Sequence, residues 1–237
     1  MFNNYWLALI VTLLIAILWL QFVENLAKRK LIKTHTSRKI IHIGTGLIYI
    51  LCWLLFPDKP FSRFFAALVP FIITIQFILV GSGLVKDQAV IDSMARSGKR
   101  EEILKGPLYY GIVFVVITMI FWKDSPIGLI SLILLCGGDG IAEIVGRNVA
   151  GKKLPWSNRK TIIGSISMFI SSLMFSVLYI YLFSLEGVFS FSMNELIPSL
   201  IVITFAGTII ESLTRSDIDN LTVPAIAIVL GQLLIVS

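Results

Sequence analysis

The stretch "IGLISLILLCGGDGIAEIV" (residues 127–145) decides the fold. Its polar residues are Ser131 and, near its end, the acids Asp139 and Glu143. A helix rises about 1.5 Å per residue, so a run of this length crosses most of the roughly 30 Å hydrocarbon layer of a bilayer. The stretch therefore predicts a membrane-spanning helix that carries two carboxylates.

The rest of the chain has the same character. Its 237 residues are 57% hydrophobic and 14% charged, with a mean hydropathy of +0.90, which is typical of an integral membrane protein. The apolar runs are continuous instead of alternating, which excludes a β-barrel. We predict an all-α integral membrane protein, a polytopic bundle embedded in the lipid bilayer as one domain over residues 1–237. About eight spans are expected near residues 5–24, 40–56, 64–80, 108–122, 127–145, 162–183, 196–212 and 222–236.

Basic residues lie almost entirely in alternate loops. Of the 20 Lys and Arg residues, only Lys59, Arg63 and Lys123 lie outside the loops near residues 28–39, 86–105, 147–160 and 215. Short cytoplasmic loops carry the excess of Lys and Arg, so these loops are predicted to be cytoplasmic and both termini to face away. The topology accounts for the pI of about 9.4 without nucleic-acid binding. Residues 81–106 are predicted to form a cytoplasmic loop with a short amphipathic helix at the membrane interface.

Ionisable groups at membrane depth are costly and by default indicate function. Asp139 and Glu143 are four residues apart, so they share one helix face and repel unless a cation or proton lies between them. The topology places other polar groups at the same membrane face: His42, Lys160, Thr161, Gly164, Ser165, Glu211, Asp217 and Asp219. Structural interpretations remain open. His42 also fits a helix end satisfied by a backbone carbonyl, and Glu211 and Asp217 fit ordinary loop charges. Close helix packing would equally explain the glycines Gly44, Gly46, Gly137, Gly138 and Gly140.

Acids beside clustered bases and glycine are typical of phosphate chemistry. Mg²⁺ takes carboxylate and phosphate oxygens, Lys and Arg neutralise the phosphates, and the N-terminus of a helix binds anions. Gly146 to Lys152 matches the spacing of a P-loop, but Lys153 replaces the Ser or Thr that would hold magnesium. The segment also follows a membrane helix instead of a strand, so it is not a P-loop.

Five motifs in the chain resemble the polyprenol kinase family of dolichol, phytol and farnesol kinases. They are "SRKIIHIGTG" (37–46), "ARSGKREEILKGPLYYG" (95–111), "GGDGIAEIVGR" (137–147), "GKKLPWSNRKTIIGSISMF" (151–169) and "DIDNLTVP" (217–224). The block from Asp139 to Ser165 is the specific part. In its short form the chain is most similar to the phytol kinases.

The resemblance implies a CTP-dependent kinase that phosphorylates a membrane isoprenoid alcohol, foremost phytol, in tocopherol or isoprenoid salvage. It implies Mg²⁺ held by Asp139 and Glu143, with Asp219 or Asp217 completing the metal site. It also implies that one carboxylate (Asp139, Glu143 or Asp217) or His42 accepts the alcohol proton. The nucleotide would be contacted by Arg38, Lys39, Arg147, Lys152, Lys153, Lys160, Thr161, Gly164 and Ser165. The location implied is a bacterial inner membrane, a thylakoid or a plastid envelope, with the active site on the cytoplasmic face.

Two other functions are weighed against this one. A cytidylyltransferase similar to CDP-diacylglycerol synthase would use the same nucleotide and similar acids, but would join CMP to phosphatidate and release pyrophosphate. A transporter would also explain charge within the membrane, but its binding groups would lie near the midplane between two repeated halves. The polar groups here collect at one end of the helices, which favours the kinase over the transporter and leaves the cytidylyltransferase as an alternative.

Overall fold

The computed structural model of the chain describes residues 2–32, 34–190, 192–215 and 217–235. Within these ranges every regular element is helical, and an isolated bridge between Lys153 and Thr161 provides the β-type pairing. The predicted all-α fold is confirmed. In chain order the elements are α1 (Tyr5–Lys28), α2 (Thr34–Cys52), η1 (Trp53–Leu55), α3 (Ser62–Ser82), α4 (Gln88–Met94), η2 (Arg100–Leu104), α5 (Gly106–Ile120), α6 (Pro126–Ile133), η3 (Leu134–Gly138), α7 (Asp139–Asn148), α8 (Ile162–Leu185), α9 (Met193–Leu213) and α10 (Asp219–Leu234).

Seven helical stretches of the described chain are long and apolar enough to cross a membrane. They are Tyr5–Ala27, Thr36–Leu55, Ser62–Ser82, Arg100–Ile120, Pro126–Asn148, Ile162–Leu185 and Met193–Leu213. Each overlaps one predicted span. The eighth predicted span, 222–236, falls on α10, although its last residue lies outside the described residues. With 16 residues, α10 is apolar but extends over only about 24 Å, less than the roughly 30 Å hydrocarbon layer.

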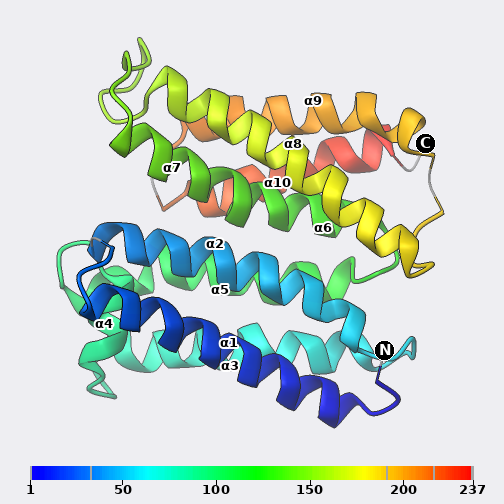
Figure 1. Cartoon of the computed structure of the whole chain (residues 1–237), viewed down its shortest axis with the longest axis horizontal. Helices are drawn as coiled ribbons and strands as arrows, with labels where there is room; N and C mark the ends of the chain where they lie inside the picture. The colour runs from blue at the N-terminus through cyan, green and yellow to red at the C-terminus, as the bar shows by residue number, and fades with distance from the viewer. Residues whose placement is uncertain (1, 33, 191, 216, 236–237) are drawn as a thin grey trace. The chain divides into compact units, whose positions relative to one another are not determined.

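The chain forms two compact units (Figure 1). Unit 1 comprises Met1–Met119 with Ser216–Leu221, and unit 2 comprises Ile120–Arg215 with Thr222–Ser237. The single polytopic domain expected over residues 1–237 stays a prediction.

In unit 1, α1 packs against both α2 and α3, and aromatic contacts join α2 to α5. Tyr49 lies at the centre, with its ring 5.8 Å from that of Phe114 and its hydroxyl donating to the Ala66 carbonyl at 3.1 Å. The same hydroxyl shares a hydrogen bond of 3.0 Å with Thr118 Oγ1. A buried hydroxyl without partners would be costly, so these hydrogen bonds hold α2 against α3 and α5.

The loop between α3 and α5 contains the short helix that the sequence predicts. Asp87 caps α4, accepting from the Val90 backbone N–H at 3.1 Å. Val90, Ile91 and Met94 pack against a small buried cluster of Phe77, Val80 and Ile103. This apolar face holds α4 against α3 and η2, and α4 also contacts α2. Figure 1 shows α4 close to the connection between α1 and α2, so two of the basic loops lie at the same end of unit 1.

The stretch 126–148 forms the centre of unit 2 as a chain of α6, η3 and α7. Of its most apolar window, 83% is buried, against 28–44% in the other candidate spans, so protein covers it on most sides. The sequence predicts one continuous α-helix here, but η3 is a π-helical turn. The Asp139 N–H bonds to the Leu134 carbonyl, five residues back instead of four. Single π-helical turns inside α-helices frequently occur at functional sites.

Small residues allow α7 to lie close to α8. A Cβ atom at Gly138 would come well within 3.0 Å of Ser172 Oγ, and one at Gly164 would lie 3.1 Å from the Ala142 carbonyl. Gly146 follows one turn later, and there a Cβ would lie 3.0 Å from Thr161 Oγ1. Gly138 at the end of η3 and Ala142 and Gly146 on α7 are spaced four residues apart, so they form one seam facing α8. Of the two interpretations left open for the glycines, close helix packing holds for Gly138.

Candidate functional site

Unit 2 brings two buried carboxylates together. Asp139 begins α7 directly after the π turn, and Glu211 lies in the last turn of α9. One carboxylate oxygen of each lies within 4.8 Å of the other, and their residues are 8% and 6% exposed. Two carboxylates at this separation in a low dielectric favour a bound cation or a shared proton, because the charged forms repel each other.

Lys160 joins this pair from the loop between α7 and α8. Its Nζ lies 2.6 Å from Glu211 Oε1 and also donates to the Glu211 backbone carbonyl. The Lys160 side chain is 17% exposed, so this ion pair lies largely out of solvent. We call Asp139, Glu211 and Lys160 the carboxylate cluster. It has the oxygen ligands that Mg²⁺ prefers, together with a cation of the kind that pairs with phosphate.

The cluster differs from the predicted pair of Asp139 and Glu143. Glu143 forms an ion pair with Arg147, one turn later on α7, at 2.8 Å. The group of close carboxylates around Asp139 contains Glu211 and does not contain Glu143. The sequence places Glu211 at the same membrane face but does not mark it as a metal ligand. The available signal was an acid that ends an apolar span, a costly position for a charge.

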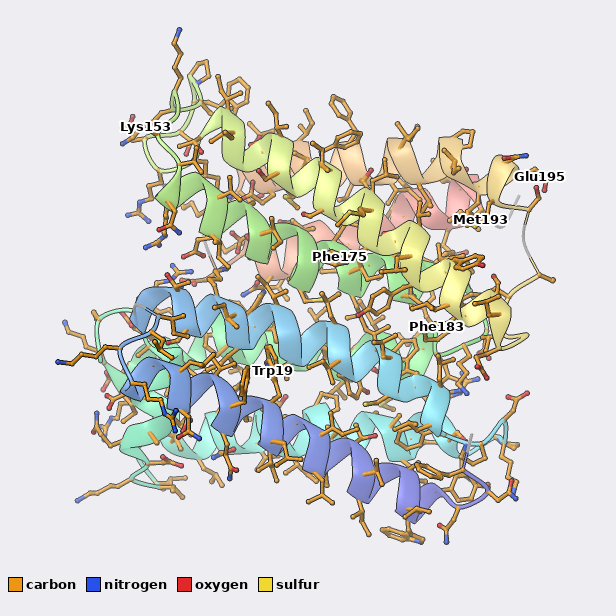
Figure 2. All side chains as sticks on the ribbon, in the orientation of Figure 1. Trp19, Lys153, Phe175, Phe183, Met193 and Glu195 are labelled. Atoms are coloured by element: carbon orange, nitrogen blue, oxygen red, sulfur yellow. The ribbon has the colours of Figure 1, made fainter. Side chains whose placement is uncertain are left out.

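The loop between α7 and α8 folds back on itself. The Leu154 N–H donates to the Lys160 carbonyl at 3.0 Å, and the Ile162 N–H donates to the Lys152 carbonyl at 3.0 Å. Lys152 and Lys153 are exposed on the opposite arm from Lys160. Figure 2 shows Lys153 in this loop, at the end of unit 2 away from Met193 and Glu195. The predicted basic residues therefore flank one end of the unit, and Arg147 in the last turn of α7 is also exposed.

Thr161 and Gly164 build the start of α8. Thr161 is the N-cap, and its Oγ1 accepts from the Gly164 N–H at 3.1 Å. The Ser165 N–H donates to the Thr161 carbonyl at 3.1 Å. These backbone groups already have partners within the chain, so they give little support to the expected anion site at this helix N-terminus. Ser165 differs in its side chain, because its buried Oγ has no hydrogen-bond partner among the described residues.

Unit 1 holds the remaining predicted residues. The His42 ring lies 4.2 Å from the Tyr110 ring, and the Tyr110 hydroxyl donates to the His42 backbone carbonyl at 2.9 Å. Arg38 and Lys39 precede His42 in the first turns of α2, where Arg38 is half-buried and Lys39 is buried. The ring planes are tilted by 41°, and this contact holds the histidine ring against Tyr110.

Asp217 and Asp219 belong to a turn that unit 1 holds firmly. Asp217 has a φ of +89°, a left-handed conformation unusual for a residue with a side chain, and its Oδ1 lies 3.2 Å from Arg96 Nη2. Asp219 Oδ1 accepts from the N–H groups of Asp217 and Asn220, at 2.9 and 3.0 Å. Asn220 Nδ2 in turn donates to the Gly106 carbonyl at 2.9 Å. Backbone conformations of this kind are held at functional sites by their surroundings.

Searches against family models and solved structures find no match. Curated relatives are found in plants. The chain is 40% identical over 213 residues to the probable chloroplastic phytol kinase of Triticum aestivum, covering 89% of this chain and 71% of the relative. It is 41% identical to probable phytol kinase 1 of Oryza sativa subsp. japonica, with coverage of 89% and 68%, and 37% identical to phytol kinase 1 of Arabidopsis thaliana, with coverage of 89% and 70%. Similarity at this level over most of both chains confirms the resemblance to the polyprenol kinases, and this chain belongs to the phytol kinase family.

Proposed function

We propose that this chain is a membrane kinase that transfers the γ-phosphoryl group of CTP to the hydroxyl of an isoprenoid alcohol, foremost phytol. The names of the relatives support a kinase with an alcohol acceptor. The observation that carries the proposal within this chain is the buried carboxylate cluster, where Asp139 and Glu211 lie within 4.8 Å and Lys160 contacts Glu211. Salvage of phytol for tocopherol synthesis would be the corresponding role.

The cluster fits a magnesium ion by its chemistry. Two carboxylates supply hard oxygen ligands, and Mg²⁺ in such sites is completed by phosphate oxygens and water. Asp139 and Glu211 would hold the ion, which would neutralise charge on the triphosphate. Asp219 stays a predicted further ligand. Glu143 also stays a predicted ligand, although in this structure it forms an ion pair with Arg147.

The proposed transfer is a single displacement at phosphorus. The alcohol oxygen attacks the γ-phosphorus, the bond from that phosphorus to the bridging oxygen of the β-phosphate breaks, and CDP leaves. Transition states of this type are stabilised chiefly by positioning and by charge. Lys160 would stabilise the charge on the transferring group, while Lys152, Lys153 and Arg147 would attract the nucleotide. Arg38, Lys39, Thr161, Gly164 and Ser165 stay predicted contacts of the nucleotide.

The hydroxyl proton must go to a base near the alcohol. A carboxylate of the cluster, Asp217 or the fixed ring of His42 would accept it. The alcohol itself would come from the bilayer, because α8 presents a row of exposed apolar side chains at helical spacing: Ile166, Ile170, Met174 and Leu178. The relatives are described as chloroplastic, which supports a plastid membrane among the predicted locations. The cytoplasmic position of the active site follows from the basic loops and stays a prediction.

Labelled CTP tests the proposal. Membranes containing the protein should transfer label from γ-labelled CTP into a lipid phosphate when phytol, geranylgeraniol or farnesol is added with Mg²⁺. Label that enters lipid only from α-labelled CTP would indicate the cytidylyltransferase instead. Transfer with neither label and with none of the alcohols would exclude a kinase of this class and favour the transporter.

A further inference from the structure

Trp156 lies in the basic loop of unit 2 with most of its ring exposed. The residue is 58% exposed, yet its Nε1 donates to Ser212 Oγ at 3.3 Å. Ser212 Oγ in turn donates to the Ile209 carbonyl at 2.7 Å, which orients the hydroxyl as an acceptor for the indole. One edge of the ring is thereby tied to the end of α9, while the rest of the ring remains accessible.

The loop that carries this ring is itself held in place. Backbone hydrogen bonds join its two arms on either side, and the Ser157 N–H donates to the Leu154 carbonyl at 3.0 Å directly around Trp156. A side chain on such a loop loses little further freedom when it binds a ligand, because the backbone is already ordered. Trp156 is therefore a preorganised aromatic surface.

Trp156 and the carboxylate cluster are attached to successive residues of α9. Lys160 contacts Glu211, and Trp156 contacts Ser212, so the same loop is fixed at two adjacent positions. The ring is therefore near the cluster in which phosphoryl transfer is proposed. Within the loop, Lys152, Lys153 and Arg159 are exposed and surround the tryptophan in sequence.

An exposed aromatic ring among cations is the arrangement with which proteins bind nucleotides without reading the base edge. The ring stacks on the base, and the cations pair with the phosphates. We propose that Trp156 is a base-stacking residue, whose exposed face receives the base of the nucleotide while its phosphates extend toward Lys160. This inference rests on the proposed kinase function and adds to it the part of the site that binds the nucleoside.

The main alternative is an anchor at the membrane surface, where tryptophan is enriched because its N–H reaches the lipid headgroups. Here the indole N–H is bonded within the protein to Ser212, and the exposed cations Lys153 and Arg159 lie three residues before and three residues after the tryptophan. The structure thus favours stacking over anchoring, and the two roles predict different kinetic effects.

The test compares Trp156→Ala with Trp156→Phe and Trp156→Leu. Loss of one stacked base lowers affinity by a factor of about 5 to 150, so Trp156→Ala should raise the apparent KM for CTP by that factor. The KM for phytol should not change. Inhibition by inorganic tripolyphosphate, which has no base, should also be unchanged. Trp156→Phe keeps an aromatic face and should retain most of the affinity, whereas Trp156→Leu keeps bulk without that face and should resemble Ala.

Trp6→Ala is the matched control, because Trp6 lies at the start of α1 in unit 1 and is 59% exposed. This variant should leave the KM for CTP unchanged. An unchanged KM for CTP in Trp156→Ala, or an equal loss of tripolyphosphate binding, would overturn the stacking role. A raised KM for phytol alone would indicate the anchor. If Trp156→Ala does not accumulate, the Phe and Leu variants decide the question. Failure of the parent protein to use CTP would refute the kinase proposal itself. This outcome is distinguished from failure of the stacking role, because it is measured on the parent protein and not on the Trp156 variants.

Discussion

Gly138→Ala should damage the site by moving Asp139, because Gly138 closes the π turn directly before it. The added Cβ would come well within 3.0 Å of Ser172 Oγ, a separation that Cβ atoms essentially never show, and 3.4 Å from Met168 Cγ. Ser172 is fully buried, so either its hydroxyl turns to another rotamer within the packed core or α7 and α8 move apart. Overpacking of this kind costs about 1–3 kcal/mol, and a displacement of about 1 Å at a reacting group can lower turnover about 100-fold.

Thermal unfolding in detergent and transfer from γ-labelled CTP to phytol measure the two effects. Gly111→Ala is the control, because a Cβ there would likewise come within 3.0 Å of a buried hydroxyl, Thr74 Oγ1, in unit 1. It should lower the unfolding temperature to a similar extent while turnover by the folded fraction stays near the parental value. Ser172→Ala removes the oxygen and leaves the Ser172 Cβ at 3.5 Å from the new methyl group, an ordinary contact.

Adding Ser172→Ala to Gly138→Ala should therefore restore both stability and turnover. The reasoning is refuted if Gly138→Ala alone retains parental turnover, because the π turn would then not position Asp139. It is also refuted if the double variant is as impaired as the single one, because the loss would then not arise from the overlap with Ser172.

Three further predictions concern the carboxylates and the topology. Glu211→Gln should lower phosphoryl transfer about 100-fold or more, and it should destabilise the protein because it removes one partner of a buried ion pair. Glu143→Gln should have a much smaller effect, because it breaks an ion pair on the helix surface that is worth only about 0.3–0.5 kcal/mol. Equal losses in both variants, measured with labelled CTP, would contradict the assignment of Glu211. Asp139→Asn should abolish most transfer but unfold at or above the parental temperature without magnesium, and Mg²⁺ with CTP should stabilise it less than the parent. A cysteine at Ser157 should react only with reagent on the cytoplasmic side and one at Gly187 only from the opposite side, and the reverse pattern would invert the predicted topology.

The sequence by itself determined the class of fold, because the bilayer leaves few choices. Backbone groups in hydrocarbon must bond within their own segment, so a continuous apolar run of sufficient length becomes a helix whatever its neighbours do. For that reason seven spans could be read from hydropathy and length alone. The capping of α4 by Asp87 and the packing role of Gly138 also follow from local rules of residue type and spacing.

The site could be predicted only as far as its residues are close in sequence. Asp139 and Glu143 are an obvious pair because they share a helix face. In the structure, however, Asp139 lies beside Glu211 on α9, and Glu143 forms an ion pair with Arg147. No local pattern states which of several acids at one membrane face approach each other. That choice depends on how α7, α8 and α9 pack, including the close approach at Gly146.

The π turn was likewise decided only by the tertiary structure. All five of its residues, Leu134–Gly138, are buried, so hydrophobic periodicity carries no mark of the extra residue in the turn. The extra residue in the turn nevertheless rotates α7 relative to α6, and this rotation sets the direction in which the Asp139 side chain points. Hydropathy measures how favourably a side chain is transferred out of water, which is a property of each residue alone. The meeting of Asp139, Glu211 and Lys160 depends on the rotation and register of packed helices, which only the complete arrangement of their side chains determines.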